Sequence, residues 1–326
     1  MEQFKGKRVL VTGGAGSIGQ EIVRNLTTHG CAQIRVLDIN ETGLFELENS
    51  LKCDHLRMLI GDIRDKDRLS RAMEDVDVVF HAAALKHVPL CEYNPFEAAK
   101  TNVLGTQNAI DCAIDNEVDR FIMISTDKAV NPTNVMGTTK LLAERLTLAA
   151  NYHKGNRRSK FSVVRFGNVL NSRGSLLTTL KQQIEKGEDV TLTHKDMTRF
   201  VMSIEEAVSL VLSAGAMCEG GEVFILKMDV LRIADLIQVI AEDLGGKRGR
   251  KVRTKLIGIR PGEKLYEELL TEDESLLVED VGDMYVLRSG ASPKAKRKKV
   301  VYNSQECSFM TDAQIRKKLI EIGYLE

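Results

Sequence analysis

The chain has 326 residues, of which 43% are hydrophobic and 28% charged, and its 46 Lys and Arg equal its 46 Asp and Glu. These values are typical of a soluble globular protein of one or two domains, and they exclude a strong basic field that would recruit nucleic acid or an anionic membrane. The basic run 294–299 is interpreted as a solvated loop. No apolar stretch reaches the roughly 20 residues of a membrane span, and the charged start lacks a signal-peptide core.

Cysteine and histidine spacing gives no metal or disulfide pattern. The six cysteines contain no C-x-x-C pair, and the six histidines contain no H-x-x-x-H pair. Zinc sites and disulfide frameworks commonly use such short spacings, so we expect neither a metal site nor structural disulfides. Reduced cysteines, together with the lack of a targeting pattern, predict a cytoplasmic protein.

Short apolar segments alternate with longer helical ones over the first half of the chain. The predicted strands are 8–12, 34–38, 56–60, 76–82, 120–125 and 162–165. The predicted helices are 20–30, 44–51, 65–72, 95–116 and 136–152. Such alternation favours a parallel sheet with helices on both faces. We therefore predict an α/β fold with a Rossmann-type doubly wound parallel sheet over residues 1–166.

The alternation becomes irregular after residue 166. A polar loop at 167–175 precedes predicted helices at 176–186, 203–217, 233–244 and 311–322, and predicted strands at 190–193, 220–226 and 252–256. The last helix opens with the capping-box pattern of Thr311 and Gln314. We predict that residues 167–326 form a smaller α/β substrate-binding lobe with a C-terminal helix. We expect helix 203–217 to return to the first domain.

A glycine-rich turn joins the first predicted strand to the first predicted helix. Gly13 permits a sharp turn, Gly16 allows the backbone to approach a pyrophosphate, and Gly19 allows the helix to pack closely on the strand. Such a turn within a strand–helix–strand unit indicates a dinucleotide site. Asp38 ends the next strand, where a carboxylate accepts hydrogen bonds from ribose hydroxyls and repels a 2′-phosphate. We therefore predict NAD rather than NADP.

Further cofactor contacts are expected after the third and fourth strands. Asp62 is placed to accept a hydrogen bond from the adenine amine, and the small residues 82–84 lie where a cofactor must pass closely. The residues predicted to contact NAD are Gly13, Gly16, Ser17, Ile18, Gly19, Asp38, Asp62, Ile63, Ala82, Ala83, Ala84, Asn102 and Lys140.

The candidate catalytic residues lie in the segment 125–140. A short-chain dehydrogenase would place Tyr four residues before Lys, but here Met136 precedes Lys140. A thioether cannot take a proton from a hydroxyl, so the usual base is missing. Asp127 and Lys128 stand upstream, next to Thr126 on the segment where such enzymes place their hydroxyl. This pattern favours a dehydratase, which must also remove a C–H proton, over simple alcohol oxidation.

Several longer motifs occur in order along the chain. Besides the glycine turn they are His-Ala-Ala-Ala-Leu-Lys-His-Val-Pro at 81–89, Ser-Thr-Asp-Lys-Ala-Val-Asn-Pro at 125–132, Arg-Phe-Gly-Asn-Val at 165–169 and Arg-Pro-Gly-Glu-Lys at 260–264. With these motifs the chain resembles, from about residue 5 to 270, the nucleotide-sugar 4,6-dehydratases of bacterial and archaeal polysaccharide biosynthesis. These are extended short-chain dehydrogenases that act on UDP-N-acetylglucosamine. Long members carry an N-terminal membrane region, and this chain resembles the short soluble form.

The resemblance implies an internal redox cycle at a UDP-sugar. NAD takes hydride from carbon 4, the resulting ketone acidifies the carbon 5 proton, the 6-hydroxyl leaves as water, and hydride returns to carbon 6. Lys128 is the expected base for carbon 5, provided that burial or neighbouring cations lower its pKa. Asp127 is the expected acid for the 6-hydroxyl and a candidate acceptor of the 4-hydroxyl proton, directly or through a water.

Other site residues follow from the same resemblance. Thr126 is expected to hydrogen-bond the 4-oxygen, Lys140 to hold the nicotinamide ribose, and Met136 to occupy the tyrosine position. Arginine suits a bidentate phosphate clamp. The residues predicted to contact the substrate are Lys86, Asn168, Arg173, Thr193, Arg199, Arg260 and Glu263.

Other functions stay open at this point. A nucleotide-sugar 4-epimerase or a reductase would normally need the tyrosine that Met136 replaces. A non-catalytic dinucleotide sensor would have no reason to retain both Lys128 and Lys140. The combination of Asp38 with Met136 and Lys140 is more similar to configuration-retaining than to inverting dehydratases. A homo-oligomer is expected for the class, through helices near 95–116 and 136–152.

Overall fold

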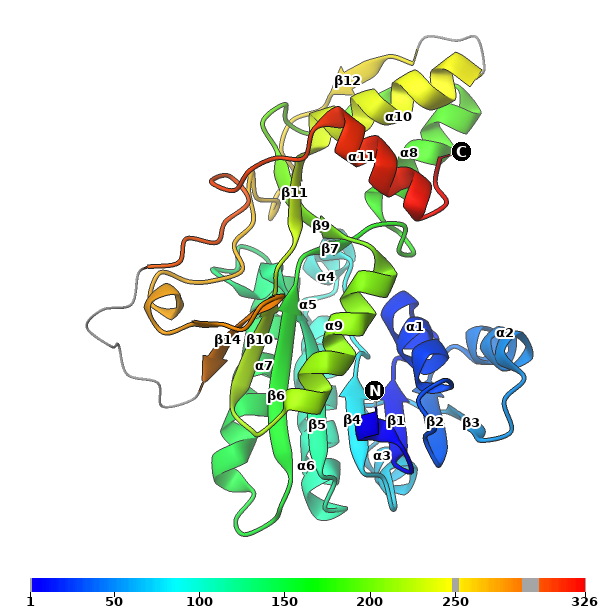
Figure 1. Ribbon diagram of the computed structural model, residues 1–326, viewed down its shortest axis with the longest axis vertical. Helices are drawn as coiled ribbons and strands as arrows, with labels where there is room; N and C mark the ends of the chain where they lie inside the picture. Colours follow the sequence, from blue (N-terminus) through cyan, green and yellow to red (C-terminus); the bar gives the residue numbers. More distant parts are fainter. Residues whose placement is uncertain (1, 248–251, 289–298, 326) are drawn as a thin grey trace.

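The computed structural model describes residues 2–247, 252–288 and 299–325, so most of the basic run lies outside the described residues. Within this part of the chain a nine-stranded sheet runs through the molecule in the order β13-β14-β10-β6-β5-β4-β1-β2-β3 (Figure 1). Its parallel strands are β1 (Arg8–Thr12), β2 (Gln33–Asp38), β3 (Leu56–Ile60), β4 (Val78–His81), β5 (Arg120–Thr126), β6 (Lys160–Phe166) and β10 (Glu222–Leu226). Two antiparallel strands complete the sheet on one side, β14 (Met284–Arg288) next to β10 and β13 (Glu279–Asp280) at the edge.

The central strands are nearly continuous apolar runs because helices cover both faces of the sheet. Alternate side chains of β1 illustrate this: Val9 and Val11 point into one core, whereas Leu10 belongs to the other. The first core is completed by α1 (Ser17–Leu26), α2 (Glu41–Leu51) and α9 (Ile204–Met217). The second is completed by α3 (Lys66–Met73), α6 (Thr106–Asp115) and α7 (Val135–His153). The predicted Rossmann-type doubly wound sheet is therefore confirmed.

The predicted helix 95–116 is divided in the structure. It consists of α5 (Pro95–Ala99), a π-helical segment η2 (Lys100–Gly105) and α6, and it follows a short helix α4 (Val88–Tyr93) that the sequence did not predict. The π-helical turn contains the buried Asn102, whose amide accepts a hydrogen bond from the Leu85 backbone N–H at 2.8 Å. Irregular turns of this kind are frequent at functional sites, and this one secures the loop that follows β4.

A smaller region with its own core lies beyond one end of the large sheet (Figure 1). Its strands are β7 (Asn168–Val169), β9 (Thr198–Met202) and β11 (Asp229–Arg232) in one sheet, and β8 (Val190–Leu192) and β12 (Thr254–Leu256) in another. Its helices are α8 (Leu176–Lys186), α10 (Ile233–Lys247) and α11 (Asp312–Glu321). The predicted capping box is confirmed, since Thr311 and Gln314 exchange side-chain-to-backbone hydrogen bonds.

The chain passes between the two regions more than once. After β9 it returns to the large sheet as α9 and β10, and then enters the smaller region again through β11 and α10. Short 3-10 segments occur at η1 (Glu2–Phe4), η3 (Asp127–Ala129) and η4 (Glu274–Leu276). In the described ranges, no helix has both the length and the apolar character needed to cross a membrane.

Candidate active site

A cavity of about 650 Å³ opens where the strand order reverses between β1 and β4. Its wall includes residues at or just beyond the carboxyl ends of β1, β4, β5 and β6, namely Gly13, Ala82, Thr126 and Gly167. The opposite wall comes from α8 and α10 of the smaller region. Doubly wound sheets bind their ligands at this topological switch point. Among the described residues, no group of three or more His, Cys, Asp or Glu could hold a metal ion.

The three glycines of the turn, Gly13, Gly16 and Gly19, line the cavity. Gly13 has a φ of +67°, and a Cβ there would lie 2.6 Å from the Cα of Ala83. A Cβ on Gly19 would lie 2.2 Å from the Gly13 carbonyl oxygen. Side chains at either position would push the turn away from β4 and from the start of α1, so both glycines are required by close approach. Ser17, Ile18, Ala82 and Ala84 line the same cavity together with Gly16.

Other residues predicted to contact the cofactor lie beyond the cavity wall. The Asp38 carboxylate holds the glycine turn, because its oxygens accept hydrogen bonds from the backbone N–H groups of Ala15 and Asn40, each at 2.9 Å. Asp62 pairs with Arg64 at 2.6 Å, and this hydrogen bond holds the pKa of Asp62 below its usual value. Residues Ile63, Ala83 and Asn102 are also outside the set that lines the cavity.

The predicted catalytic segment brings the side chains of Thr126, Asp127 and Lys128 into direct contact at the end of β5. The Thr126 hydroxyl donates a hydrogen bond to Asp127 Oδ1 at 2.8 Å, and Lys128 Nζ donates to the same oxygen at 2.9 Å. Lys128 Nζ also donates to Asn168 Oδ1 at 3.2 Å. Asp127 is fully buried, and its second oxygen has no hydrogen-bond partner among the described residues. Thr126 and Lys128 face the cavity, whereas Asp127 lies behind them.

The expected lowering of the Lys128 pKa is wrong for the free protein. Burial acts to lower that pKa, but the carboxylates of Asp127 and Glu267 outweigh it and raise the pKa above its ordinary value. Glu267 Oε1 lies 3.8 Å from Lys128 Nζ. Lys128 is therefore an ammonium at neutral pH, and it must lose a proton before it can act as a base.

Met136 and Lys140 stand one helical turn apart on α7 and both line the cavity. The Met136 side chain is 4% exposed and packs with Cys91 and Ala98. Lys140 Nζ donates a hydrogen bond to the Ile124 carbonyl oxygen at 2.7 Å. Burial lowers the pKa of Lys140 to about 8, although the nearby Glu144 carboxylate raises it in part.

Ser125 is a polar residue of the cavity that was not among the predicted contacts. Ser125 lines the cavity, and its buried hydroxyl has no hydrogen-bond partner in the part of the chain that the structure describes. A buried hydroxyl without a partner is costly unless a ligand or water completes it. Its place directly before Thr126 was the available signal, because it extends the run of hydroxyl groups at the end of β5.

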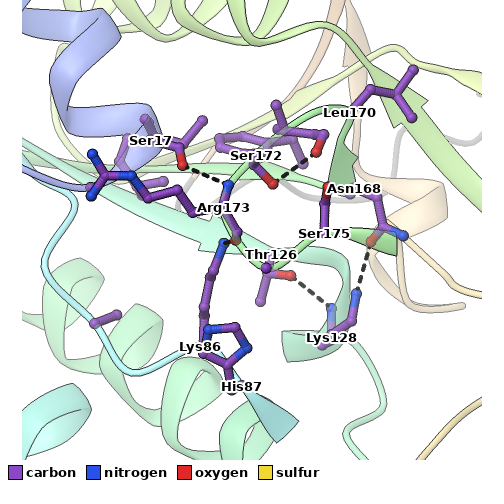
Figure 2. A pocket seen from close by; sticks show the side chains of 18 of the residues that line it. Ser17, Lys86, His87, Thr126, Lys128, Asn168, Leu170, Ser172, Arg173 and Ser175 are labelled. Carbon is purple, nitrogen blue, oxygen red and sulfur yellow. Dashed lines mark hydrogen bonds between the residues drawn. The ribbon is translucent and has the colours of Figure 1, made fainter. Parts of the chain in front are cut away.

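The loop 171–175 crosses the glycine turn (Figure 2). The Arg173 backbone N–H donates to the Ser17 hydroxyl at 3.0 Å, and the Arg173 guanidinium donates to the Ala15 carbonyl oxygen at 3.1 Å. Lys86 Nζ donates to the Arg173 carbonyl oxygen at 2.8 Å. Lys86, Asn168 and Arg173 all line the cavity, so the structure brings three of the predicted substrate contacts together there.

The other four predicted substrate contacts lie outside the cavity lining. Arg199 is 6% exposed, and its guanidinium donates to three backbone carbonyl oxygens, those of Thr198, Lys264 and Leu265. Thr193 is half-buried in the smaller region, Arg260 is exposed, and Glu263 accepts a hydrogen bond from the Arg260 backbone N–H at 3.3 Å. In this conformation the Arg199 guanidinium is engaged by backbone and does not form a free phosphate clamp.

Three features define the class of protein. They are the sheet order, the glycine turn, and Lys140 placed one helical turn after Met136. The protein has an extended short-chain dehydrogenase/reductase fold, with a cavity at the switch point where folds of this kind bind their ligands. The chain belongs to the family described as "Polysaccharide biosynthesis protein", which it matches over residues 9–289.

Similar proteins support the family assignment over nearly the whole length. An uncharacterized membrane protein of Methanocaldococcus jannaschii is 62% identical over 325 residues, which cover 99% of this chain and 98% of that protein. A UDP-N-acetylglucosamine 4,6-dehydratase (inverting) of Campylobacter jejuni subsp. jejuni serotype O:23/36 (strain 81-176) is 43% identical over 286 residues, which cover 87% of this chain and 83% of that protein. The X-ray structure of Pen from Bacillus thuringiensis has a TM-score of 0.93 and 42% identity, with 98% and 99% of the two chains covered.

Proposed function

We propose that the protein is an NAD-dependent UDP-N-acetylglucosamine 4,6-dehydratase. The observation that carries this proposal is the contact of Thr126, Asp127 and Lys128 at the wall of a cavity whose tyrosine position is Met136. The Lys128 amine at the cavity wall, and the Asp127 carboxylate that the Thr126 hydroxyl connects to the cavity, provide two groups for separate proton transfers. Water loss next to a ketone needs both, whereas epimerisation at carbon 4 needs neither a C–H base nor an acid for a leaving hydroxyl.

The cofactor assignment depends on the glycine turn and on Asp38. Gly13 and Gly19 leave space that a side chain would fill, which suits a pyrophosphate lying against the backbone. The Asp38 carboxylate at the end of β2 favours free ribose hydroxyls over a 2′-phosphate. Bound NAD would supply hydride chemistry, by accepting hydride from carbon 4 of the sugar and returning it to carbon 6. Lys140, buried beside the cavity, would hold the nicotinamide ribose.

Proton transfer from the 4-hydroxyl is assigned to Thr126 and Asp127. The Thr126 hydroxyl contacts the cavity and donates to Asp127 Oδ1. It can take a proton from the sugar while it passes its own to the carboxylate. Asp127 then holds a proton that it can return through the Thr126 hydroxyl to the departing 6-hydroxyl, so one carboxylate serves both steps. Lys128, as a neutral amine, removes the proton on carbon 5.

The carbon 5 configuration is proposed to be retained. Lys128 is in direct contact with Asp127, and one amine can take the carbon 5 proton and return it to the same face. The relative from Campylobacter jejuni is named as inverting. Inversion would require a second proton donor on the opposite face of the sugar. The stereochemistry therefore needs to be measured separately from the activity.

Substrate contacts are proposed from Lys86, Asn168 and Arg173, because these side chains surround the cavity. We propose that residues 1–166 bind the cofactor and that 167–326 supply the substrate side. Within 167–326, α9 returns to the first domain as predicted, and β10, β13 and β14 also join its sheet, which the sequence did not predict. We also propose a homo-oligomer through the helices of segments 95–116 and 136–152, since the side chains of Phe96, Leu104 and Leu142 are exposed there. Light scattering of the purified protein would report the number of subunits.

The activity is tested by incubating the NAD-loaded protein with UDP-N-acetylglucosamine and analysing the product by mass spectrometry. The proposal predicts a product lighter by one water, with no net accumulation of NADH. A product of unchanged mass would instead indicate an epimerase, and no conversion would indicate a binding protein. Proton NMR of the product formed in deuterated water reports the configuration at carbon 5.

A further inference from the structure

A second buried carboxylate, that of Glu267 in the segment after β12, faces Lys128. The Glu267 side chain is 2% exposed, and Oε1 lies 3.8 Å from Lys128 Nζ and 3.9 Å from Arg199 Nε. Its backbone N–H donates to the Ser304 hydroxyl at 2.9 Å, and that hydroxyl also shares a hydrogen bond with Thr198 at 2.8 Å. Ser304 therefore holds the backbone of Glu267 in place. Glu267 is not part of the cavity lining, so it would act on the substrate only through Lys128.

The surroundings of Glu267 are electrically balanced but incompletely hydrogen-bonded. Asp127 and Glu267 supply two negative charges, and Lys128 and Arg199 supply two positive ones. Glu267 Oε2 is buried and has no hydrogen-bond partner among the described residues. Burial is the main cause that raises the pKa of Glu267, and the Asp127 carboxylate adds to it, while Lys128, Arg199 and Lys264 lower it in part. A buried carboxylate with a raised pKa accepts a proton more readily than an exposed one.

The proposed reaction leaves one proton without an assigned place. Lys128 is an ammonium in the free protein, yet it must be a neutral amine when it removes the carbon 5 proton. Asp127 cannot take this proton, because it already holds the one that came from the 4-hydroxyl. Once Asp127 is neutral, one of the two charges that raise the Lys128 pKa is gone. The remaining carboxylate next to Lys128 is Glu267.

We infer that Glu267 accepts the ammonium proton of Lys128 and so sets the amine free for carbon 5, an inference that rests on the proposed dehydratase function. One N–H bond of Lys128 breaks and one O–H bond of Glu267 forms, with no change in oxidation state. The separation of 3.8 Å is longer than a hydrogen bond, so the transfer needs a small rotation of the Lys128 side chain or one bridging water. After the carbon 5 proton has been returned, the proton on Glu267 goes back to Lys128.

The inference is tested with Glu267→Gln, which keeps the shape of the side chain but cannot take the proton. NADH formation after mixing with UDP-N-acetylglucosamine is followed by stopped-flow absorbance, and water loss is followed by mass spectrometry. Oxidation at carbon 4 depends on Thr126 and Asp127, so NADH should appear at close to the wild-type rate. Turnover should fall by about 10²-fold or more, the usual scale of acid–base catalysis, and NADH should persist instead of being consumed.

Two further variants separate this role from a structural one. Glu268→Gln removes the neighbouring half-buried carboxylate, which bonds Asn131 at 3.0 Å, and it should behave like wild type. Glu267→Asp keeps a carboxylate and should recover part of the lost turnover. Equal slowing of NADH formation and of water loss in Glu267→Gln would make Glu267 structural and overturn the inference. Wild-type or faster turnover in that variant would also overturn it.

A measurement without substrate keeps the inference separate from the proposed function. If wild-type protein forms neither NADH nor product, the proposed function fails, and the link between Glu267 and Lys128 is then tested by amine labelling. Lys128 labelling is quantified by mass spectrometry across a pH series in the folded protein. Removing the Glu267 charge should shift the labelling of Lys128 to lower pH, because that charge raises the Lys128 pKa. An unchanged profile would show that the two groups are not coupled and would overturn the inference.

Discussion

Replacing Asp127 by Asn removes the proposed proton acceptor while it keeps the shape of the side chain. The amide oxygen of the Asp127→Asn variant can still accept the hydrogen bonds that Thr126 and Lys128 now give to Oδ1, at 2.8 and 2.9 Å. The amide cannot take the 4-hydroxyl proton or give one to the 6-hydroxyl. Turnover should therefore fall by about 10²- to 10⁴-fold, which corresponds to about 2.7–5.4 kcal/mol of transition-state stabilisation.

The same substitution has a separate effect on stability. The amide NH₂ would occupy the position of Oδ2, which is buried and has no hydrogen-bond partner among the described residues. An unpaired buried donor costs about 1–3 kcal/mol. The substitution also removes the charge pair between Asp127 and Lys128. The Lys128 side chain is 22% exposed and keeps Asn168 and Glu267 nearby, so losing this pair should destabilise the protein less than losing a fully buried pair. Thermal unfolding measures this cost.

Product formation by the Asp127→Asn variant is measured under substrate saturation, with Met136→Leu as the control. Met136 is 4% exposed and packs against Cys91 and Ala98, so a residue of similar volume should cost less than about 1.5 kcal/mol of stability and leave turnover close to wild type. An Asp127→Asn variant that turns over at nearly the wild-type rate would refute the role of Asp127. A crippled Met136→Leu variant beside it would mean that the roles have been assigned to the wrong residues.

Three further substitutions test other parts of the site. Lys128→Met should abolish water loss while UDP-sugar binding, measured by calorimetry, survives; dehydration at a near wild-type rate would remove Lys128 from the mechanism. Asp38→Ala should weaken NAD binding and reduce the discrimination against NADP, and equal affinities of the wild-type protein for both cofactors would contradict the assignment. Lys140 has a folded pKa of about 8 against an ordinary 10.5, so the unfolded chain binds more protons between these values. The unfolding free energy should therefore rise with pH across that window, by about 3 kcal/mol, and urea titrations of Lys140→Met should lack this rise.

Local sequence patterns predicted the helices and strands that are determined by residues close together in the sequence. Strand Arg8–Thr12 and helix Leu176–Lys186 occur with the predicted bounds, because apolar periodicity and glycine positions identify them. Strands β9 and β14 were missed. Thr198–Met202 pairs with segments near residues 168 and 229, and Met284–Arg288 pairs with β10, so their partners are remote in sequence. A five-residue apolar run does not by itself reveal such pairing.

The candidate site follows the same division between local and remote contacts. Thr126, Asp127 and Lys128 were predictable because they are adjacent in the chain. Glu267 was not, since it is remote from Lys128 in the sequence and only the fold brings the two side chains together. Arg199 has the charge of a phosphate ligand, but the sequence does not reveal that backbone carbonyls engage its guanidinium.

Internal hydride transfer is the central claim, and it is tested most directly with UDP-N-acetylglucosamine that carries deuterium at carbon 4. The product is analysed by NMR and mass spectrometry after incubation with the NAD-loaded protein. The proposed function predicts that the deuterium moves to carbon 6 of a 4-keto-6-deoxy product, within the same sugar. Deuterium that returns to carbon 4 with inversion there, or that is lost to free NADH, would contradict it.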